Sequence, residues 1–130
     1  MVELYVDQLM SRPVETVTPS TPIQEAAAEL LEHDVGAVVV VDDSDRLEGL
    51  LTATDFVQIV RDGLASSDAT VAEFMRTDVV TTRRSAPASD VVDAMLEHLI
   101  HHVPVVDGEA VVGMITTLDL AAYLGRSLEP

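Results

Sequence analysis

The sequence contains no cysteine, no lysine and no tryptophan, and aromatic residues make up only 3% of it. Without cysteine there is no disulfide framework and no thiolate chemistry. So few aromatic rings argue against nucleic-acid binding by base stacking, which needs aromatic platforms. The core must therefore be aliphatic. The longest apolar run, Ala37 to Val41, is far too short to span a membrane.

Positive charge is also scarce. Acidic residues number 23 and basic residues 7, all of them arginine, which gives a formal net charge of −16. Such a chain repels phosphate backbones and anionic membranes, so we expect neither nucleic acid nor membrane as a partner. Acidic excess without lysine favours a halophilic protein over an ordinary acidic one, and its fold should gain stability as salt screens self-repulsion. The start, "MVELYVDQLM", lacks the basic region of a signal peptide, so we expect a soluble, cytoplasmic protein.

The chain is a tandem repeat. At an offset of 65 residues, "LMSRPVETV" (9–17) matches "FMRTDVVTT" (74–82), and "VVVVD" (38–42) matches "VPVVD" (103–107). At an offset of 64, "GLLTATD" (49–55) matches "GMITTLD" (113–119). Because 62–70 is a polar stretch with glycine and serine, we predict a first repeat over 1–62, a linker over 63–70 and a second repeat over 71–130.

Each half shows the same order of predicted elements. Val14–Val17 and Val79–Thr82 are predicted strands, and each precedes a helix whose apolar residues recur at i, i+3, i+4, i+7 and i+8. Those residues are Ile23, Ala26, Ala27, Leu30 and Leu31, then Ala88, Val91, Val92, Met95 and Leu96. Two β-branched runs joined by "DDSDR" or "DGE" predict a hairpin, and a last helix begins near "TATDF" or "TTLDL". The fold class is therefore α+β, built from two β-α-β-β-α repeats.

The paired motif Gly-x-x-Thr-x-x-Asp has two compatible interpretations. Thr52 with Asp55, and Thr116 with Asp119, fit a capping box at a helix start, with the preceding glycine where the strand passes close to another backbone. The same helix start also suits a phosphate, through its free N–H groups and positive dipole end. An Asp there can accept hydrogen bonds from two ribose hydroxyls, as it does in dinucleotide folds.

Taken in order, these pieces resemble a pair of cystathionine β-synthase (CBS) domains, the tandem called a Bateman module. The resemblance runs from about Val6 to Leu124 and rests on the Met, the strand, the Pro, the helix, the valine-rich run ending in Asp, and the paired motif, each present twice. It implies two repeats packed sheet to sheet about a pseudo-twofold axis, with two clefts between them. It also implies a regulatory module that binds AMP, ADP, ATP, S-adenosylmethionine, NAD or cyclic di-AMP.

The resemblance also implies site residues. Asp55 and Asp119 would hold the ribose, and Thr52 and Thr116 would lie near ribose or phosphate. The residues that would line the base are Leu50, Met114, Thr18 and Arg83.

Histidines distinguish the two halves. Relatives that bind nucleotides often carry His or Arg before "PVVD", and the second half has His101 and His102 there. The first half has Gly36 and Ala37, so one cleft is expected to be empty or weak. The alternative for the histidine pair is a surface helix end.

Other polar residues leave alternatives open. Arg83 and Arg84 suit phosphate binding, or form a salt-bridged surface pair. His33 and His98 are expected to be solvent-facing cap residues. No third ligand at a recognisable spacing accompanies the histidine pair, so no metal site is predicted.

The sequence therefore predicts an adenosyl-ligand sensor that signals to an unidentified protein partner and requires no cofactor. No activated nucleophile, acid–base pair or metal set is recognisable, so no enzyme activity is predicted. The helices that carry "FVQIV" and "LAAYL" are apolar on more than one face, which predicts a homodimer. The alternative is a structural homodimerisation module with degenerate clefts, although the intact Thr and Asp of both copies count against it.

Overall fold

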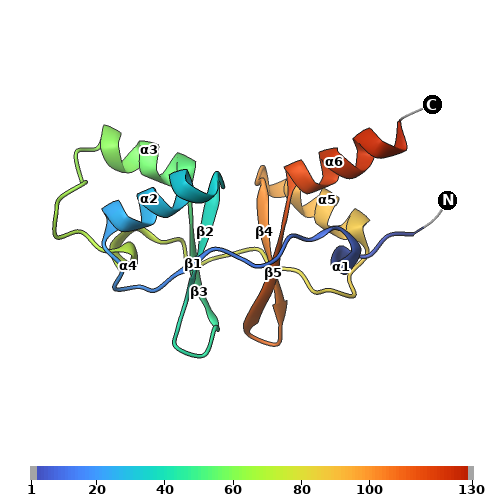
Figure 1. The fold of residues 1–130 in the computed structure, drawn as a ribbon, viewed down its shortest axis with the longest axis horizontal. Coiled ribbons are helices and arrows are strands. Elements are labelled where there is room, and N and C mark those ends of the chain that lie inside the picture. The colour runs from blue at the N-terminus through green and yellow to red at the C-terminus, as the bar shows by residue number, and fades with distance from the viewer. Residues whose placement is uncertain (1–2, 129–130) are drawn as a thin grey trace. The chain divides into compact units, whose positions relative to one another are not determined.

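A computed structural model describes residues 3–128 of the chain. The described residues form two compact units (Figure 1). We call residues 15–79 the central unit. Residues 3–14 together with 80–128 form the terminal unit.

The units cut across the two sequence repeats. The first residues of the chain pack with the hairpin and helices of the second repeat, while residues 71–79 pack with the first. The whole segment predicted to be a linker, 63–70, lies within the central unit. Ala69 is 4% exposed within its core, and Thr70 is the N-cap of a short helix. The repeats thus exchange their leading segments. The two packed units therefore have different boundaries from the two sequence repeats.

The central unit contains a three-stranded sheet. Its elements are β1 Thr16–Val17, α2 Ile23–His33, β2 Ala37–Val41, β3 Leu47–Thr52, α3 Ala53–Arg61 and α4 Val71–Phe74. The strand order is β1-β2-β3, in which β1 runs parallel and β3 antiparallel to β2. All five residues of β2 are buried, as expected of the middle strand. The predicted strand, helix, hairpin and helix of the first repeat are all present.

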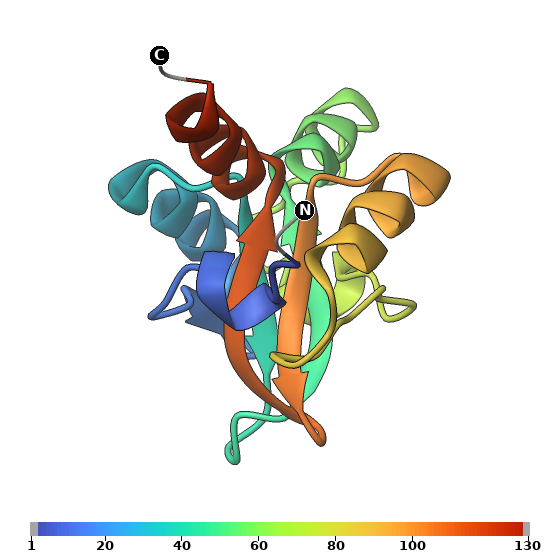
Figure 2. The same ribbon diagram turned by 90° about the vertical axis from the view of Figure 1, so that its right-hand side faces the viewer.

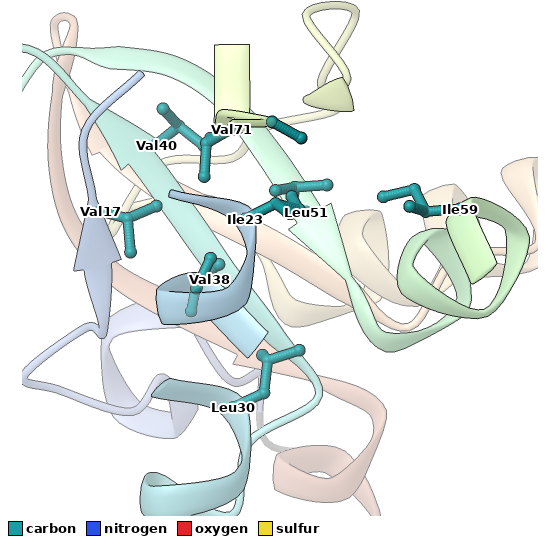
Figure 3. Packing of buried hydrophobic residues seen from close by; sticks show 10 residues of the cluster. Val17, Ile23, Leu30, Val38, Val40, Leu51, Ile59 and Val71 are labelled. Atoms are coloured by element: carbon teal, nitrogen blue, oxygen red, sulfur yellow. The ribbon is translucent and has the colours of Figure 1, made fainter. Parts of the chain in front are cut away.

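The core of the central unit is aliphatic (Figure 3). Ile23 and Leu30 of α2 pack with Val38 and Val40 of β2, and Leu51 of β3 is fully buried beside them. The helix contributes one face at the 3.6-residue period and the strands contribute alternate residues, so the two sequence periodicities meet in one cluster.

The terminal unit contains a two-stranded sheet. Its elements are α1 Val6–Leu9, α5 Ala88–His98, β4 His102–Asp107, β5 Ala110–Thr116 and α6 Thr117–Ser127. Figure 2 shows the β4–β5 hairpin with α1 and α6 beside it. Its core cluster consists of Val6, Val91, Met95, Val103, Val105 and Ile115. No helix among residues 3–128 has the length and apolar content to cross a membrane.

The strand predicted over Val79–Thr82 is wrong. Only a single parallel bridge forms there, between Thr82 and Val105. In the central unit, the N–H of Val39 donates to the carbonyl of Glu15 at 3.1 Å and extends β1 pairing. The matching residue in the second repeat is Pro104, which has no N–H to donate. One proline therefore reduces the predicted strand to a bridge.

Two short helices, α1 and α4, were not predicted. Each is a single turn of four residues, which is too short to show a helical period. Val6 of α1 and Val71 of α4 are fully buried, so these turns contribute to the two cores.

Candidate functional site at two helix starts

The start of α6 is fixed by a reciprocal pair of hydrogen bonds. The N–H of Asp119 donates to Thr116 Oγ1 at 3.1 Å, and the N–H of Thr116 donates to Asp119 Oδ2 at 2.9 Å. At the start of α3, the N–H of Thr52 donates to Asp55 Oδ2 at 2.9 Å and the N–H of Asp55 to Thr52 Oγ1 at 3.4 Å. The predicted capping boxes are confirmed at both places.

The glycine of each motif permits a close backbone crossing, as the sequence suggested. A Cβ on Gly49 would lie 2.7 Å from the carbonyl oxygen of Arg76. One on Gly113 would lie 3.3 Å from the carbonyl oxygen of Ser11 and 2.7 Å from the side-chain sulfur of Met10. At both crossings the passing segment pairs with the strand residue after the glycine. Leu50 exchanges backbone hydrogen bonds with Arg76, and Met114 exchanges them with Ser11. The glycine thus brings residue 11 or 76 beside the motif.

The two aspartates differ in what binds their second oxygen. Asp119 Oδ1 accepts a hydrogen bond from Ser11 Oγ at 2.7 Å. Asp55 Oδ1 accepts a hydrogen bond from Arg76 Nε at 2.8 Å and forms an ion pair with Arg76 Nη2, also at 2.8 Å. Asp55 is only 6% exposed, whereas Asp119 is half-buried. The hydrogen bond and charge of Asp55 raise the pKa of Arg76 above its usual range.

Ser11 and Arg76 were not recognised as site residues from the sequence. They occupy matching positions, directly after the methionines of "LMSR" and "FMRT". That alignment was the available signal. Its meaning depends on the glycine crossings, which only the folded chain shows.

The histidines lie next to the start of α6. His102 opens β4 and pairs with Thr116, and the carbonyl of His101 accepts the N–H of Thr117 at 3.0 Å. Burial lowers the pKa of His102, the charge of His101 lowers it further, and Asp119 opposes that shift. His101 itself is exposed.

The matching backbone positions of the central unit carry no imidazole. Ala37 pairs with Thr52, and the carbonyl of Gly36 accepts the N–H of Ala53 at 2.9 Å. The two helix starts therefore share a backbone arrangement and differ in their side chains. One has two histidines and a serine, and the other has an arginine.

The remaining predicted residues are placed less uniformly. Leu50 and Met114 are buried next to the glycine crossings, while Thr18 and Arg83 are exposed. Thr18 Oγ1 lies 3.2 Å from the hydroxyls of both Ser20 and Thr21. Arg83 and Arg84 line a separate open hollow of about 340 Å³ in the terminal unit. The other residues of that hollow are Ser85, Val106, Asp107 and Gly108.

Comparison with known proteins settles the family. The CBS domain model matches the chain twice, over residues 6–62 and 71–126. The chain belongs to the CBS domain family. The predicted resemblance and the α+β fold class are thereby confirmed, and the two matches leave out residues 63–70, the segment between the predicted repeats.

Several CBS proteins are similar to this chain along most of their length. Hypoxic response protein 1 of Mycobacterium tuberculosis is 32% identical over 117 residues, which cover 89% of this chain and 82% of that protein. The CBS domain-containing protein YhcV of Bacillus subtilis is 34% identical over 116 residues, again 89% of this chain and 82% of that protein.

Among solved structures, the CBS domain pair of protein MJ0100 has a TM-score of 0.90 and 28% sequence identity, and the alignment covers 97% of this chain and 99% of that one. That structure is a complex with 5′-methylthioadenosine and S-adenosyl-L-methionine.

Proposed function

We propose that this CBS pair binds an adenosine-containing ligand and that the ribose is held by Asp119. The observation that carries the proposal is the side-chain set at the start of α6. The half-buried carboxylate of Asp119 accepts hydrogen bonds from the Ser11 hydroxyl and the N–H of Thr116, and His101 and His102 lie beside this helix start. A ribose hydroxyl can replace the serine hydroxyl with little loss, because both donate to the same oxygen.

Asp55 is a poorer site. A ribose that approached Asp55 Oδ1 would have to displace a guanidinium bound through two nitrogens at 2.8 Å. Charge-assisted pairs of this kind are about twice as strong as neutral hydrogen bonds. The Arg76 side chain therefore blocks the matching site of the central unit, so we propose one adenosyl ligand per chain.

Signalling by this module would depend on how differently the ligand binds two states of the protein. A ligand shifts a conformational or association equilibrium only by its differential affinity for the two states. We propose that the ligand acts in this way on a homodimer and thereby on a protein partner, in a cytoplasm rich in salt, and that the chain itself catalyses no reaction. The structural homodimerisation module remains the second candidate.

A panel of ligands tests the proposal by thermal shift. AMP, ATP, S-adenosylmethionine, 5′-methylthioadenosine and NAD would each be added to the protein at high salt. A ligand present at 100 times its Kd adds about 2.7 kcal/mol, which corresponds to a rise in melting temperature of roughly 5–15 °C for a chain of this size. Guanosine analogues serve as controls. If no adenosyl compound raises the melting temperature at millimolar concentration, the module binds none of them.

The histidine pair predicts a pH dependence that requires phosphate. The imidazolium form of His102 attracts phosphate, and its pKa is lowered in the folded protein. The charged form of His102 therefore becomes the major form only at a pH below the ordinary pKa of about 6.5. We expect the ratio of AMP affinity to adenosine affinity to rise as pH falls below 6.5, and His102→Ala to flatten that rise. If the ratio of AMP affinity to adenosine affinity is constant between pH 5.5 and 7.5, His102 does not bind the phosphate.

Exposed apolar side chains on four helices support the homodimer. Leu31 of α2 and Leu96 of α5 are 84% and 71% exposed at matching positions of the two repeats. Val60 of α3 and Leu124 of α6 are 71% and 55% exposed, again at matching positions. Burial of these apolar side chains against a second copy of the chain would stabilise a dimer. Light scattering at high salt should give twice the chain mass of 14.0 kDa, and Val60→Asp with Leu124→Asp should lower it. A monomer mass throughout the micromolar range would contradict the homodimer.

A further inference from the structure

A cluster of three metal-ligating side chains lies in the central unit, away from the capping boxes in the sequence. His33 Nε2 lies 3.2 Å from Glu29 Oε2 and 3.4 Å from Glu15 Oε2. All three donor atoms lie within 4.8 Å of one another. Among residues 3–128 this is the one group of three or more His, Cys, Asp or Glu donors that meets such a spacing. From the sequence, no metal site was predicted and His33 was expected to be a solvent-facing cap residue.

Two elements bring these donors together. Glu29 and His33 are four residues apart on α2, so they share one face of the helix. Asp34 ends α2 in the left-handed conformation, which places His33 in its last turn. Glu15 precedes β1 and is held by its carbonyl, which accepts the N–H of Val39 at 3.1 Å. The helix pair was visible in the sequence, whereas the third donor depends on the β1–β2 pairing.

The two distances from His33 to the carboxylates are those expected of donors in a tetrahedral zinc site. Nitrogen and oxygen donors bound to zinc at 2.0–2.1 Å lie about 3.3 Å apart when the angle between them is tetrahedral. The separations of His33 Nε2 from Glu29 and Glu15, 3.2 and 3.4 Å, fall on either side of this value, and the two carboxylate oxygens lie within 4.8 Å of each other. One imidazole and two carboxylates leave a fourth position for water, and the −2 charge of the carboxylates would be balanced by the ion.

The second repeat provides an internal comparison. His98 occupies the position that matches His33, at the end of α5. Ala94 and Val80 stand where the first repeat has Glu29 and Glu15. The helix, its left-handed cap and its histidine therefore form without the carboxylates. The helix end therefore forms without the cluster, so the two carboxylates are specific to the first repeat.

From this geometry we infer that Glu15, Glu29 and His33 form a zinc site in the central unit. The site shares no residue with the set proposed to bind the adenosyl ligand in the terminal unit. The competing interpretation is a protonated His33 shared between two carboxylates, which would hold the same distances without an ion.

The experiment is a titration of the chelator-treated full chain with zinc chloride, followed by calorimetry. We expect one ion per chain. His33→Ala and Glu29→Gln should each lower zinc affinity at least about tenfold, since even the loss of outer-sphere partners costs 10–100-fold. His98→Ala and Glu32→Gln are the matched controls. Glu32→Gln removes the same charge from the same turn of α2 without touching the cluster, so it should change affinity by less than about twofold.

A second readout identifies the coordination. Cobalt chloride in place of zinc should give the visible absorption of a four-coordinate ion with the wild-type chain and with Glu32→Gln, and none with His33→Ala. Glu15→Gln and Glu29→Gln keep the size of the side chain, so they test the site even if His33→Ala fails to fold. The inference is overturned if the wild-type chain binds no zinc. It is equally overturned if Glu32→Gln weakens binding as much as Glu29→Gln, which would indicate a diffuse cation atmosphere around the acidic surface.

Discussion

Asp119→Asn is expected to weaken binding of the adenosyl ligand at least tenfold. Two ribose hydroxyls donating to a carboxylate make charge-assisted hydrogen bonds, each contributing about 1.5–3 kcal/mol, and a loss of 1.4 kcal/mol already lowers affinity tenfold. The asparagine amide retains one carbonyl oxygen, which can still accept the N–H of Thr116 that Asp119 Oδ2 now accepts. The variant therefore removes the charge and keeps the helix cap. Isothermal titration with the ligand found by thermal shift measures the change.

The matched control is Asp55→Asn, the same change in the other copy of the motif. Because Arg76 is already bound to the Asp55 carboxylate in the folded chain, we expect Asp55→Asn to change ligand affinity by less than about twofold. Circular dichroism and the melting temperature without ligand would show whether either variant has lost its fold. Equal affinity of the wild-type chain and a folded Asp119→Asn variant would falsify the role of Asp119.

Arg76→Ser is expected to create a second ligand site. The substitution gives the central unit the side chain that the terminal unit has at Ser11, and it frees Asp55 Oδ1 from the guanidinium. The number of ligands bound per chain should rise from one to two. Affinity at the new site should be lower for a nucleotide than for adenosine or S-adenosylmethionine, because Gly36 and Ala37 supply no cation for phosphate.

The same substitution should also lower stability. Asp55 is almost fully buried and would lose its charged partner, although Arg76 itself is 57% exposed and its pairing is screened by water. We expect a loss of about 1–3 kcal/mol in the free energy of unfolding, measured by denaturant titration at fixed salt.

Ser11→Arg is the converse variant. It should close the α6 site with an ion pair to Asp119 and abolish binding. If Arg76→Ser stays folded and still binds one ligand, Arg76 does not block the central site. The role of Asp119 would be untouched by that result.

Much of the fold could be predicted from the sequence because it follows from local rules. The helix α2 and its repeat α5 begin and end near their apolar periodicity, and the β-branched runs form the two hairpins. The capping boxes at Thr52 and Thr116 lie where the Thr-x-x-Asp spacing indicated, since both partners are three residues apart on one turn. Repetition of the whole pattern was enough to indicate the CBS family, which the family match confirms.

What the sequence could not determine depends on residues far apart in the chain. The exchange of leading segments places Ser11 against Asp119, 108 residues later, and Arg76 against Asp55. No local spacing predicts either contact, because each requires a segment to cross the motif's glycine at close range. Pro104 reduced a predicted strand to a bridge because it occupies the position of Val39 in the other repeat, where the backbone N–H pairs with the incoming strand. By itself, the sequence determined the long helices, the two hairpins, the repeat and the capping role of Asp55 and Asp119. The tertiary structure decided which side chain binds the second carboxylate oxygen of each aspartate, because that contact depends on the packing of segments far apart in the chain.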